Sequence, residues 1–504
     1  MSEPHELTAL AQGEAIAAGE LSAAELAAHY LARIEAYGAT VGAFVTVTGE
    51  QAMAQARSLD EARSRAAGGG STTSGSAGGP HRPLAGVPTA IKDLTLTAGV
   101  RTTFGSAAFA NFVPPVDADV VRLMRDAGLV SLGKTTTSEL GCSLYSEGAV
   151  APPARNPWGL DFTAGGSSGG AAAAVAAGLV PVAQGSDGGG SLRIPAAICG
   201  VIGYKPSRGL VSGGPLGFGG FGLPTSGPIG RTVTDVAALL DVLAVPVPGE
   251  PFLAPTTPDG GYLGAARAAA PGRLRIGRFM DPMLADTPVD PACVAAVDAA
   301  ATAMAGAGHD VVDVPAPFRP DIWPLFQTIW FSLALSPVPP EREPDLLPLT
   351  RWLRQRGAAV SAGALMGALS ELQARVRVAM AAYGGFDLLL SPTLAAPQAK
   401  VGWFTETGDP ADDFDRQRRF SPYCAVYNVT GQPAVSLPVG AAAGGMPVGV
   451  MLAGRFGADD VLLAVAAQLE QLLPWGDRHP PLWGGTPSTT VMSDPGSDTM
   501  SWGR

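Results

Sequence analysis

The sequence predicts an α/β protein in which helices pack in layers on a largely buried β-sheet. Over residues 83–240, short β-branched and apolar runs alternate with helical segments, a pattern typical of α/β layer structures. The composition supplies a large core, since 46% of the 504 residues are hydrophobic and only 15% are charged. The 66 Gly and 45 Pro residues provide the many turns that such a chain needs.

The N-terminal region is expected to be mostly helical, in the order helix 6–18, helix 22–37, strand 43–48 and helix 50–66. Ser22, followed three residues later by Glu25, has the spacing of a capping box and marks the start of the second helix. Residues 68–80 are almost entirely Gly, Ser and Thr. The apolar pattern resumes directly afterwards, so this run predicts a flexible insertion rather than a domain boundary.

The remaining chain is expected to alternate between strands and helices. Within residues 83–240 the expected elements are strand 87–91, helix 118–127, strand 129–132, helix 168–178 and strand 180–183. The later elements are strand 274–277, helix 290–307, strand 310–314, helix 362–383, strand 387–390, strand 434–437, strand 448–452 and helix 459–472. Apolar periodicity is the basis of these assignments. The polar tail, residues 484–504, is expected to be disordered.

The charge balance argues against nucleic acid as a partner. The net charge of −11 and the isoelectric point near 5.0 repel polyanions. The N-terminus shows no basic and apolar regions of a signal peptide, and the most apolar stretch, residues 171–183, is shorter than the roughly 20 residues of a membrane span. We therefore expect a cytoplasmic protein without a membrane segment.

The cysteines predict neither a disulfide framework nor a zinc site. No C-x-x-C pair occurs, no histidines cluster in the sequence, and the four thiols are widely separated, at Cys142, Cys199, Cys293 and Cys424. Reduced thiols and a site without metal are the expectation.

Two Gly/Ser loops carry the strongest chemical signal. One loop covers residues 165–170, and the other ends with Gly188, Gly189, Gly190 and Ser191. Consecutive glycines allow backbone N–H groups to converge on one point, as an oxyanion site requires. The pattern favours Ser191 as a nucleophile beside such a site, with two ordinary loops as the alternative.

A serine nucleophile needs a base, and a lysine is the better candidate here. The usual partner is histidine, but none lies in the two loops: the five are His5, His29, His81, His309 and His479. Lys92 directly follows the apolar strand expected at 87–91 and should lie at a strand end near the core. Burial would lower its pKa and supply a neutral amine. A structural pair between Lys92 and Asp93 is the alternative.

These motifs resemble the amidase signature family. Residues 165–195 resemble the signature itself, and residues 84–93 are similar to the segment that carries the family's lysine. Further matches are Gly133-Lys134-Thr135 with Glu139, Asn156-Pro157-Trp158, and residues 199–206, 428–433 and 447–454. The similarity covers roughly residues 5–475. It implies one domain over residues 1–483, with a catalytic core at about 83–240 and a central mixed sheet covered by helices on both faces.

The resemblance also implies a catalytic set. By motif position, the nucleophile falls on Ser191, the second serine, which lies in a cis peptide, on Ser167, and the base on Lys92. A proton would pass from Ser191 through Ser167 to neutral Lys92, and water would cleave the resulting acyl-enzyme. This mechanism requires neither a metal nor an organic cofactor. Many relatives form dimers, so a homodimer is also expected.

Two positions depart from the family pattern. Gly188 follows Asp187 where the family usually carries Thr or another branched residue, which predicts a more mobile loop. Thr136 stands where many members have Asn, and this difference concerns the acyl-side pocket.

Two glycine motifs point to nucleotides but have the wrong context. Gly128-x-x-x-x-Gly133-Lys134-Thr135 fits the P-loop pattern, yet the expected strand lies between the two glycines instead of before them. The motif Gly217-x-Gly219-x-x-Gly222 resembles a dinucleotide loop, but Pro224 follows and no helix begins there. Neither motif predicts nucleotide binding.

Two other functions remain as alternatives. Gly165-x-Ser167-x-Gly169 matches the nucleophile elbow of α/β-hydrolases, which would need an acid and then a histidine downstream. The amidase signature fold also serves as the A-type amidotransferase subunit of a tRNA-amidating complex, whose function depends on partner proteins.

The substrate is expected to be a small-molecule amide. Bulky apolar residues outside the signature could line a pocket or pack in the core, namely Trp323, Phe326, Trp330, Phe331, Trp403 and Phe404. Our hypothesis is hydrolysis of a small to medium linear carboxamide with an apolar or aromatic acyl group.

Overall fold

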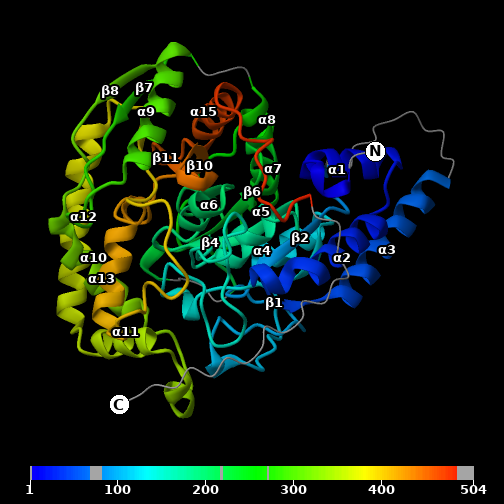
Figure 1. Ribbon diagram of the computed structural model, residues 1–504, viewed down its shortest axis with the longest axis horizontal. Coiled ribbons are helices and arrows are strands. Elements are labelled where there is room, and N and C mark those ends of the chain that lie inside the picture. The colour runs from blue at the N-terminus through cyan, green and yellow to red at the C-terminus, as the bar shows by residue number, and fades with distance from the viewer. Residues whose placement is uncertain (1–2, 69–81, 216–219, 269–271, 485–504) are drawn as a thin grey trace, which may run out of the picture.

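The computed structural model describes residues 3–68, 82–215, 220–268 and 272–484. These residues form one large α/β domain around a single eleven-stranded sheet, which confirms the predicted fold class (Figure 1). The insertion expected at 68–80, apart from Gly68, lies outside the described residues, as does the expected tail apart from residue 484.

The strands, in chain order, are β1 (Phe44–Val47), β2 (Pro88–Lys92), β3 (Val130–Thr135), β4 (Val182–Asp187), β5 (Ile202–Lys205), β6 (Thr225–Gly230), β7 (Arg275–Arg278), β8 (Asp310–Asp313), β9 (Leu388–Pro392), β10 (Ala434–Ala441) and β11 (Pro447–Gly454). They are arranged in the order β1-β3-β2-β4-β6-β5-β10-β11-β9-β7-β8. β2 pairs in parallel with β3 and β4, and β7 pairs in parallel with β8 and β9. The other pairs are antiparallel, so the sheet is mixed.

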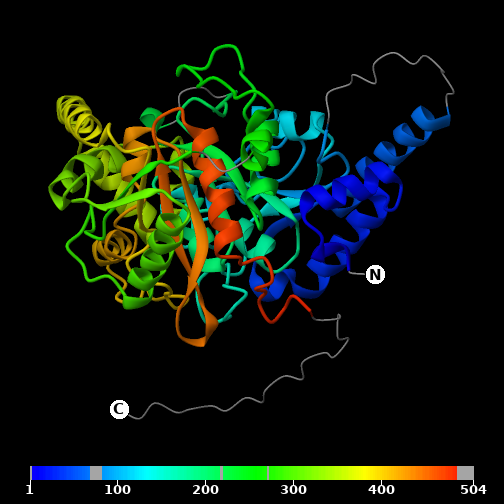
Figure 2. The same cartoon turned by 90° about the horizontal axis from the view of Figure 1, so that it is seen from above.

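Helices cover both faces of the sheet (Figures 1 and 2). They are α1 (Ala9–Ala18), α2 (Ala23–Val41), α3 (Gly49–Gly68), α4 (Asp119–Asp126), α5 (Gly169–Ala176), α6 (Arg193–Cys199), α7 (Val233–Leu243), α8 (Gly261–Arg267), α9 (Pro291–Gly306), α10 (Trp323–Leu333), α11 (Pro348–Ala358), α12 (Ala362–Tyr383), α13 (Pro410–Phe420), α14 (Val426–Thr430) and α15 (Asp459–Leu472). Helices α10 to α13 gather at one end of the domain, on the left of Figure 1. None of the helices in the described residues combines the length and the apolar character that a membrane span needs.

The N-terminal helices differ from the prediction in the form of the first helix and in the end of the second, which extends to Val41 instead of residue 37. The capping box of α2 is confirmed, because Ser22 Oγ accepts from the Glu25 N–H at 3.1 Å and Glu25 Oε2 accepts from the Ser22 N–H at 2.9 Å. The single helix expected at 6–18 is instead a 3-10 turn, Pro4–Glu6, followed by α1. The Thr8 hydroxyl accepts from the Ala11 N–H and starts α1 at residue 9.

Two central strands, β5 and β6, are absent from the elements predicted from the sequence. Both contain glycine, and β6 also contains Pro228, residues that usually indicate turns. The glycines are required by close backbone contacts. A Cβ added at Gly203 would lie 2.3 Å from Leu192 O, and one at Gly227 would lie 2.3 Å from Tyr204 O.

The sheet brings the candidate residues to one edge. Because β2 and β4 are parallel neighbours, their final residues, Lys92 and Asp187, lie at the same edge. The Ala-rich helix α5 is completely buried beside these strands. Its backbone approaches the residue after β3 so closely that a Cβ at Gly170 would lie 2.4 Å from Thr136 N.

We expect Gly203→Ala to destabilise the fold by about 1–3 kcal/mol, because the added methyl group would overlap the Leu192 carbonyl. Gly306→Ala is the matched control, since a Cβ there meets no atom within 4 Å and alanine favours the helix. Denaturant unfolding followed by circular dichroism measures both changes. Equal stability of the two variants would contradict the close-contact explanation.

Candidate active site

Two of the predicted site residues line a cavity near the edge of the sheet where β2 and β4 end, whereas Lys92, Ser167, Gly188 and Gly190 are not in its wall. The cavity has about 510 Å³ of empty volume, and Gly189 and Ser191 form part of its wall. Other parts of the wall come from residues 141–144, from α10 and from α13. The site therefore combines the signature loops with helices that lie more than a hundred residues later in the chain.

Lys92 is the last residue of β2 and is completely buried. Its Nζ donates to Ser167 Oγ at 2.7 Å, to Ser186 Oγ at 3.1 Å and to Ser186 O at 3.2 Å. Burial lowers the pKa of Lys92 to about 7, and the charge of Asp187 opposes this shift. A substantial fraction of the amine is therefore neutral near pH 7.

Ser167 follows a cis peptide bond between Gly166 and Ser167, and it is nearly completely buried. The Ser146 hydroxyl donates to Ser167 O at 3.3 Å and accepts from the Gly169 N–H at 3.2 Å. The Ser168 N–H donates to Ser191 O at 3.2 Å. This last bond joins the loop that carries Ser167 to the loop that carries Ser191.

The segment beside the cis peptide is supported by α13. A Cβ at Gly166 would lie 2.8 Å from Tyr145 N, so this segment lies directly against Gly166. The Tyr145 hydroxyl donates to Asp413 Oδ2 at 2.6 Å, and Gln417 Nε2 donates to Asp413 Oδ1 at 2.7 Å. Gln417 Oε1 accepts from the Leu144 N–H at 3.0 Å. Burial raises the pKa of Asp413 to about 6.

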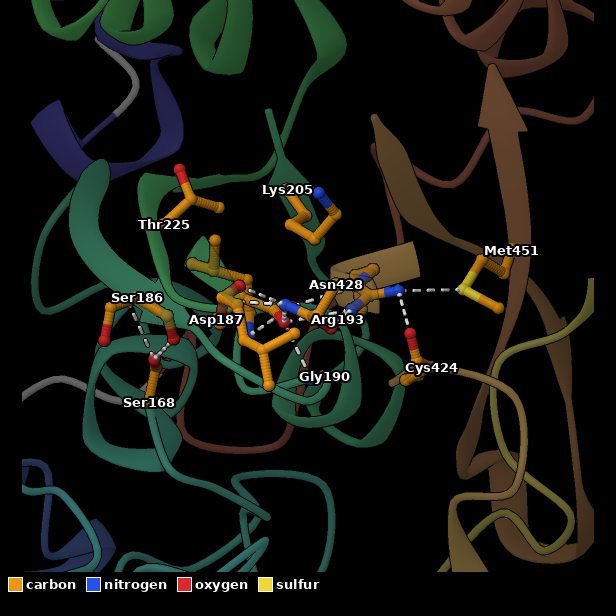
Figure 3. Close-up of polar contacts among 12 residues, drawn as sticks. Ser168, Ser186, Asp187, Gly190, Arg193, Lys205, Thr225, Cys424, Asn428 and Met451 are labelled. Atoms are coloured by element: carbon orange, nitrogen blue, oxygen red, sulfur yellow. Dashed lines mark hydrogen bonds and ion pairs between the residues drawn. The ribbon is translucent and has the colours of Figure 1, made fainter. Parts of the chain in front are cut away.

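Asp187 and Arg193 form a completely buried ion pair beside the loop that carries Gly190 (Figure 3). Arg193 Nη2 donates to Asp187 Oδ1 at 2.9 Å, and Arg193 Nε donates to Asp187 Oδ2 at 2.9 Å. Asn428 Nδ2 donates to Asp187 O at 2.8 Å. Burial alone would raise the pKa of Asp187, but Arg193 and Asn428 hold it well below its ordinary value.

The three loop glycines are not equivalent. The Gly190 N–H donates to Asp187 Oδ1 at 2.7 Å and is therefore already occupied, contrary to the expectation that it faces an oxyanion. Within the described residues, the N–H groups of Gly188, Gly189 and Ser191 have no hydrogen-bond acceptor. These three groups are the available donors of the loop.

Three of the six bulky residues noted in the sequence line the cavity. Trp323, Phe326 and Trp330 are in its wall. Of the others, Phe331 packs against Trp352 and Phe414. Phe404 is buried against Tyr145 and Phe420, and Trp403 is 37% exposed. Packing explains these last three residues better than a pocket does.

A second buried lysine of this edge, Lys134, has a structural role. It lies within β3, and its Nζ donates to Thr97 Oγ1 at 3.0 Å and to Thr102 Oγ1 at 2.9 Å. Asp93 faces Lys134 at 4.0 Å, so the pair considered between Lys92 and Asp93 is not formed. In the described chain, Lys134 is followed by a short 3-10 turn, Glu139–Gly141, and not directly by the α-helix that a P-loop requires. Thr136 is not in the cavity wall either; its backbone joins Ala43 and Gly170.

None of the described histidines lines the cavity. His309 contacts Gln468, and His479 stacks on Trp483. His81 and residues 216–219 of the second glycine motif lie outside the described residues. The fold brings His5 and His29 together with Glu3, a grouping that their sequence separation concealed. All four cysteines are free thiols, and Cys142 lines the cavity.

Three residues that organise the site have no function assigned to them from the sequence pattern. These are Asp187, Arg193 and Asn428. Asp187 and Arg193 lie six residues apart inside the signature segment. An acid and a base at this short separation are the sequence feature that could have indicated their ion pair. Asn428 lies 241 residues from Asp187, and no local pattern connects the two.

We expect Arg193→Met to destabilise the protein by about 3–5 kcal/mol, because Asp187 would remain buried without a countercharge. Arg278→Met is the control, since its partners Asp313 and Asp298 are 74% and 53% exposed and each such pair contributes less than about 1 kcal/mol. Adding Asp187→Asn to Arg193→Met should restore part of the lost stability, because it removes the unpaired buried charge. Denaturant unfolding measures all three variants, and similar losses for Arg193→Met and Arg278→Met would refute this role.

Proteins similar to this chain include a hydrolase and an amidotransferase subunit. The 6-aminohexanoate-cyclic-dimer hydrolase of Paenarthrobacter ureafaciens is 36% identical over 504 residues, covering 94% of this chain and 96% of that protein. The A-type subunit of the glutamyl-tRNA(Gln) amidotransferase from Synechococcus sp. (strain WH7803) is 36% identical over 485 residues, covering 90% of this chain and 95% of that protein.

Solved structures and family profiles agree with this similarity. The structure of a bacterial aryl acylamidase of the amidase signature family superposes with a TM-score of 0.80 at 27% identity, covering 94% of this chain and 98% of that one. The family profile described as Amidase matches residues 25–463. The chain therefore belongs to the amidase signature family.

Proposed function

We propose that this protein is a serine amidase in which Ser191 is the nucleophile, Ser167 relays the proton and Lys92 is the base. The observation that carries the proposal is the 2.7 Å contact between the buried Lys92 Nζ and Ser167 Oγ. A buried amine with a pKa of about 7 accepts a proton at neutral pH. The bond between Ser168 and Ser191 supports a fixed geometry between the two serine loops.

In the first half-reaction, Ser191 Oγ attacks the carbonyl carbon of the amide. Its proton moves to Ser167 Oγ while the Ser167 proton moves to the neutral amine of Lys92. The carbonyl electron pair moves onto oxygen and returns as the C–N bond breaks. The proton travels back through Ser167 to the leaving amine, which leaves an acyl-enzyme on Ser191.

In the second half-reaction, water replaces the amine. Water attacks the acyl carbon, its proton enters the same relay, and Ser191 Oγ takes a proton back as the C–O bond to the enzyme breaks. We assign the oxyanion donors to Gly188 and Gly189, together with the Ser191 N–H, because the Gly190 N–H is bound by Asp187. The reaction uses only side chains, backbone N–H groups and water.

The cavity favours an amide with an apolar or aromatic acyl group. Trp323, Phe326 and Trp330 supply aromatic surface beside Ser191. A similar solved structure is that of an aryl acylamidase. The relative from Paenarthrobacter ureafaciens is named for a cyclic dimer, so cyclic amides must be compared with the linear carboxamides that we propose.

The second candidate function is that of an A-type amidotransferase subunit. The 36% identity to such a protein from Synechococcus favours keeping it. This function requires glutamine as the amide donor and a partner protein. Hydrolysis of aryl or alkyl amides by the purified chain alone supports the amidase, whereas glutaminase activity only in a complex supports the amidotransferase.

We expect a fluorophosphonate to label Ser191, because a phosphonylated serine requires an activated nucleophile. The label should be lost in Ser191→Ala and in Lys92→Ala, and it should persist in Lys400→Ala, whose side chain is exposed. Peptide mass spectrometry locates the label, and circular dichroism checks that each variant is folded. A label on Ser167, or one that persists without Lys92, would reverse the assigned roles.

We expect kcat/KM to rise with pH through an apparent pKa near 7, since only the neutral form of Lys92 accepts the proton and burial lowers its pKa to about 7. Activity should therefore be small at pH 5 and level off above about pH 8. Initial rates on an aryl amide from pH 5 to 9 measure this dependence, with EDTA present as a control that should have no effect. A profile without change between pH 6 and 8 would exclude Lys92 as the base.

A further inference from the structure

Arg418, on α13, is the one charged side chain in the wall of the Ser191 cavity, among the residues that the structure describes. Its guanidinium carbon lies 5.2 Å from the centre of the Trp323 ring, and Trp323 is itself a wall residue. The Arg418 side chain is only 23% exposed. An apolar cavity thus contains one partly desolvated cation.

The charge of Arg418 is only partly compensated. Its Nη2 donates to Asp415 Oδ1, while Arg419 Nε lies 2.6 Å from Asp415 Oδ2. Two arginines therefore share one carboxylate. Within the described residues, neither Nε nor Nη1 of Arg418 has an acceptor, and Nε is buried. The guanidinium of Arg418 therefore retains part of its positive charge and has N–H donors that are not hydrogen-bonded.

The neighbouring acids of α13 are bound to other partners. Asp412 Oδ2 accepts from Arg416 Nε at 2.8 Å. Asp413 accepts from Tyr145 and Gln417, as described above. Neither carboxylate forms an ion pair with Arg418 among the described residues. Among the described residues, Asp415 is the only acceptor for Arg418, so the unpaired Nη1 group can donate to a group that enters the cavity.

We propose that the preferred substrates are amides whose acyl group ends in a carboxylate, which Arg418 binds across an apolar spacer. The inference rests on the proposed amidase function and specifies its substrate class. A carboxylate is favoured over a neutral acceptor because guanidinium binds it through charge-assisted hydrogen bonds. The aromatic side chains that share the cavity wall with Ser191 and Arg418 would contact the spacer.

Two isosteric substrate pairs test this specificity. Adipamic acid is compared with 6-methylheptanamide, and 4-carboxyphenylacetamide with 4-isopropylphenylacetamide. Each pair keeps the shape and the scissile amide and differs in the terminal charge. We expect the wild-type protein to favour at least one carboxylate member over its neutral partner by roughly tenfold or more in kcat/KM.

Three variants separate binding of the carboxylate from general packing. Arg418→Gln should lose the preference, because the KM for the carboxylate substrate should rise far more than the KM for its neutral partner. Arg418→Lys should keep part of the preference, since it keeps the charge. Arg419→Gln should keep all of it, because Arg419 contacts the same Asp415 but is 58% exposed and is not in the cavity wall.

Binding without turnover distinguishes failure of this inference from failure of the amidase function. Calorimetric titration of 4-carboxyphenylacetamide and its neutral partner into Ser191→Ala, with and without Arg418→Gln, measures the preference directly. Selective binding that depends on Arg418, without any hydrolysis by the wild type, would uphold this inference and reject the amidase. Equal binding of the two amides, or a preference that survives Arg418→Gln, would overturn the inference whatever the hydrolysis rates.

Discussion

The buried ion pair between Asp187 and Arg193 is the interaction on which the geometry of the site depends. Both side chains are completely excluded from solvent, and isolated charges in that environment are strongly unfavourable. The pair is therefore tolerated only with nearly all its hydrogen bonds made. Asp187 accepts from the N–H groups of Gly190 and Leu192, on either side of Ser191. The position of Ser191 thus follows from the requirement to satisfy a buried carboxylate.

The same pair links two distant parts of the chain. Arg193 Nη1 donates to Cys424 O at 2.8 Å, and Arg193 Nη2 donates to Asn428 Oδ1 at 2.8 Å (Figure 3). These contacts attach the segment before β10 to the Ser191 loop. A displacement of that segment would leave donors of a buried guanidinium unpaired, which is costly. The loop and the second half of the sheet are therefore held as one unit.

Three buried lysines show why the proposed base is chosen by its contacts and not by a lowered pKa alone. Burial lowers the pKa of Lys92 to about 7, of Lys134 to about 8 and of Lys205 to about 7. Lys134 contacts threonines and Lys205 donates to Pro206 O. Only Lys92, among these three, contacts the serine that follows the cis peptide. The motif around Lys92 favours it on sequence grounds, and the contact supplies an independent physical reason.

The parts of the fold that sequence patterns predicted are those that depend on local spacing. Helices α12 and α15 begin and end where apolar periodicity places them. β5 and β6 escape prediction because their glycines are required by close contacts with distant backbone, which no local pattern records. The position of Arg418 in the cavity wall was not predicted for a similar reason, since it depends on how α13 packs against the loop near Tyr145.

The surroundings of Gly188 include α10, a helix that the sequence pattern did not predict. A Cβ at Gly188 would lie 3.6 Å from Pro224 and 3.8 Å from Trp330, which are ordinary contact distances. The additional branches of a threonine at this position would therefore meet the Trp330 ring or the proline. Gly188 has no side chain, and the ring of Trp330, a cavity wall residue, lies next to it. A branched side chain at position 188 would therefore compete for space with Trp330, which lines the cavity.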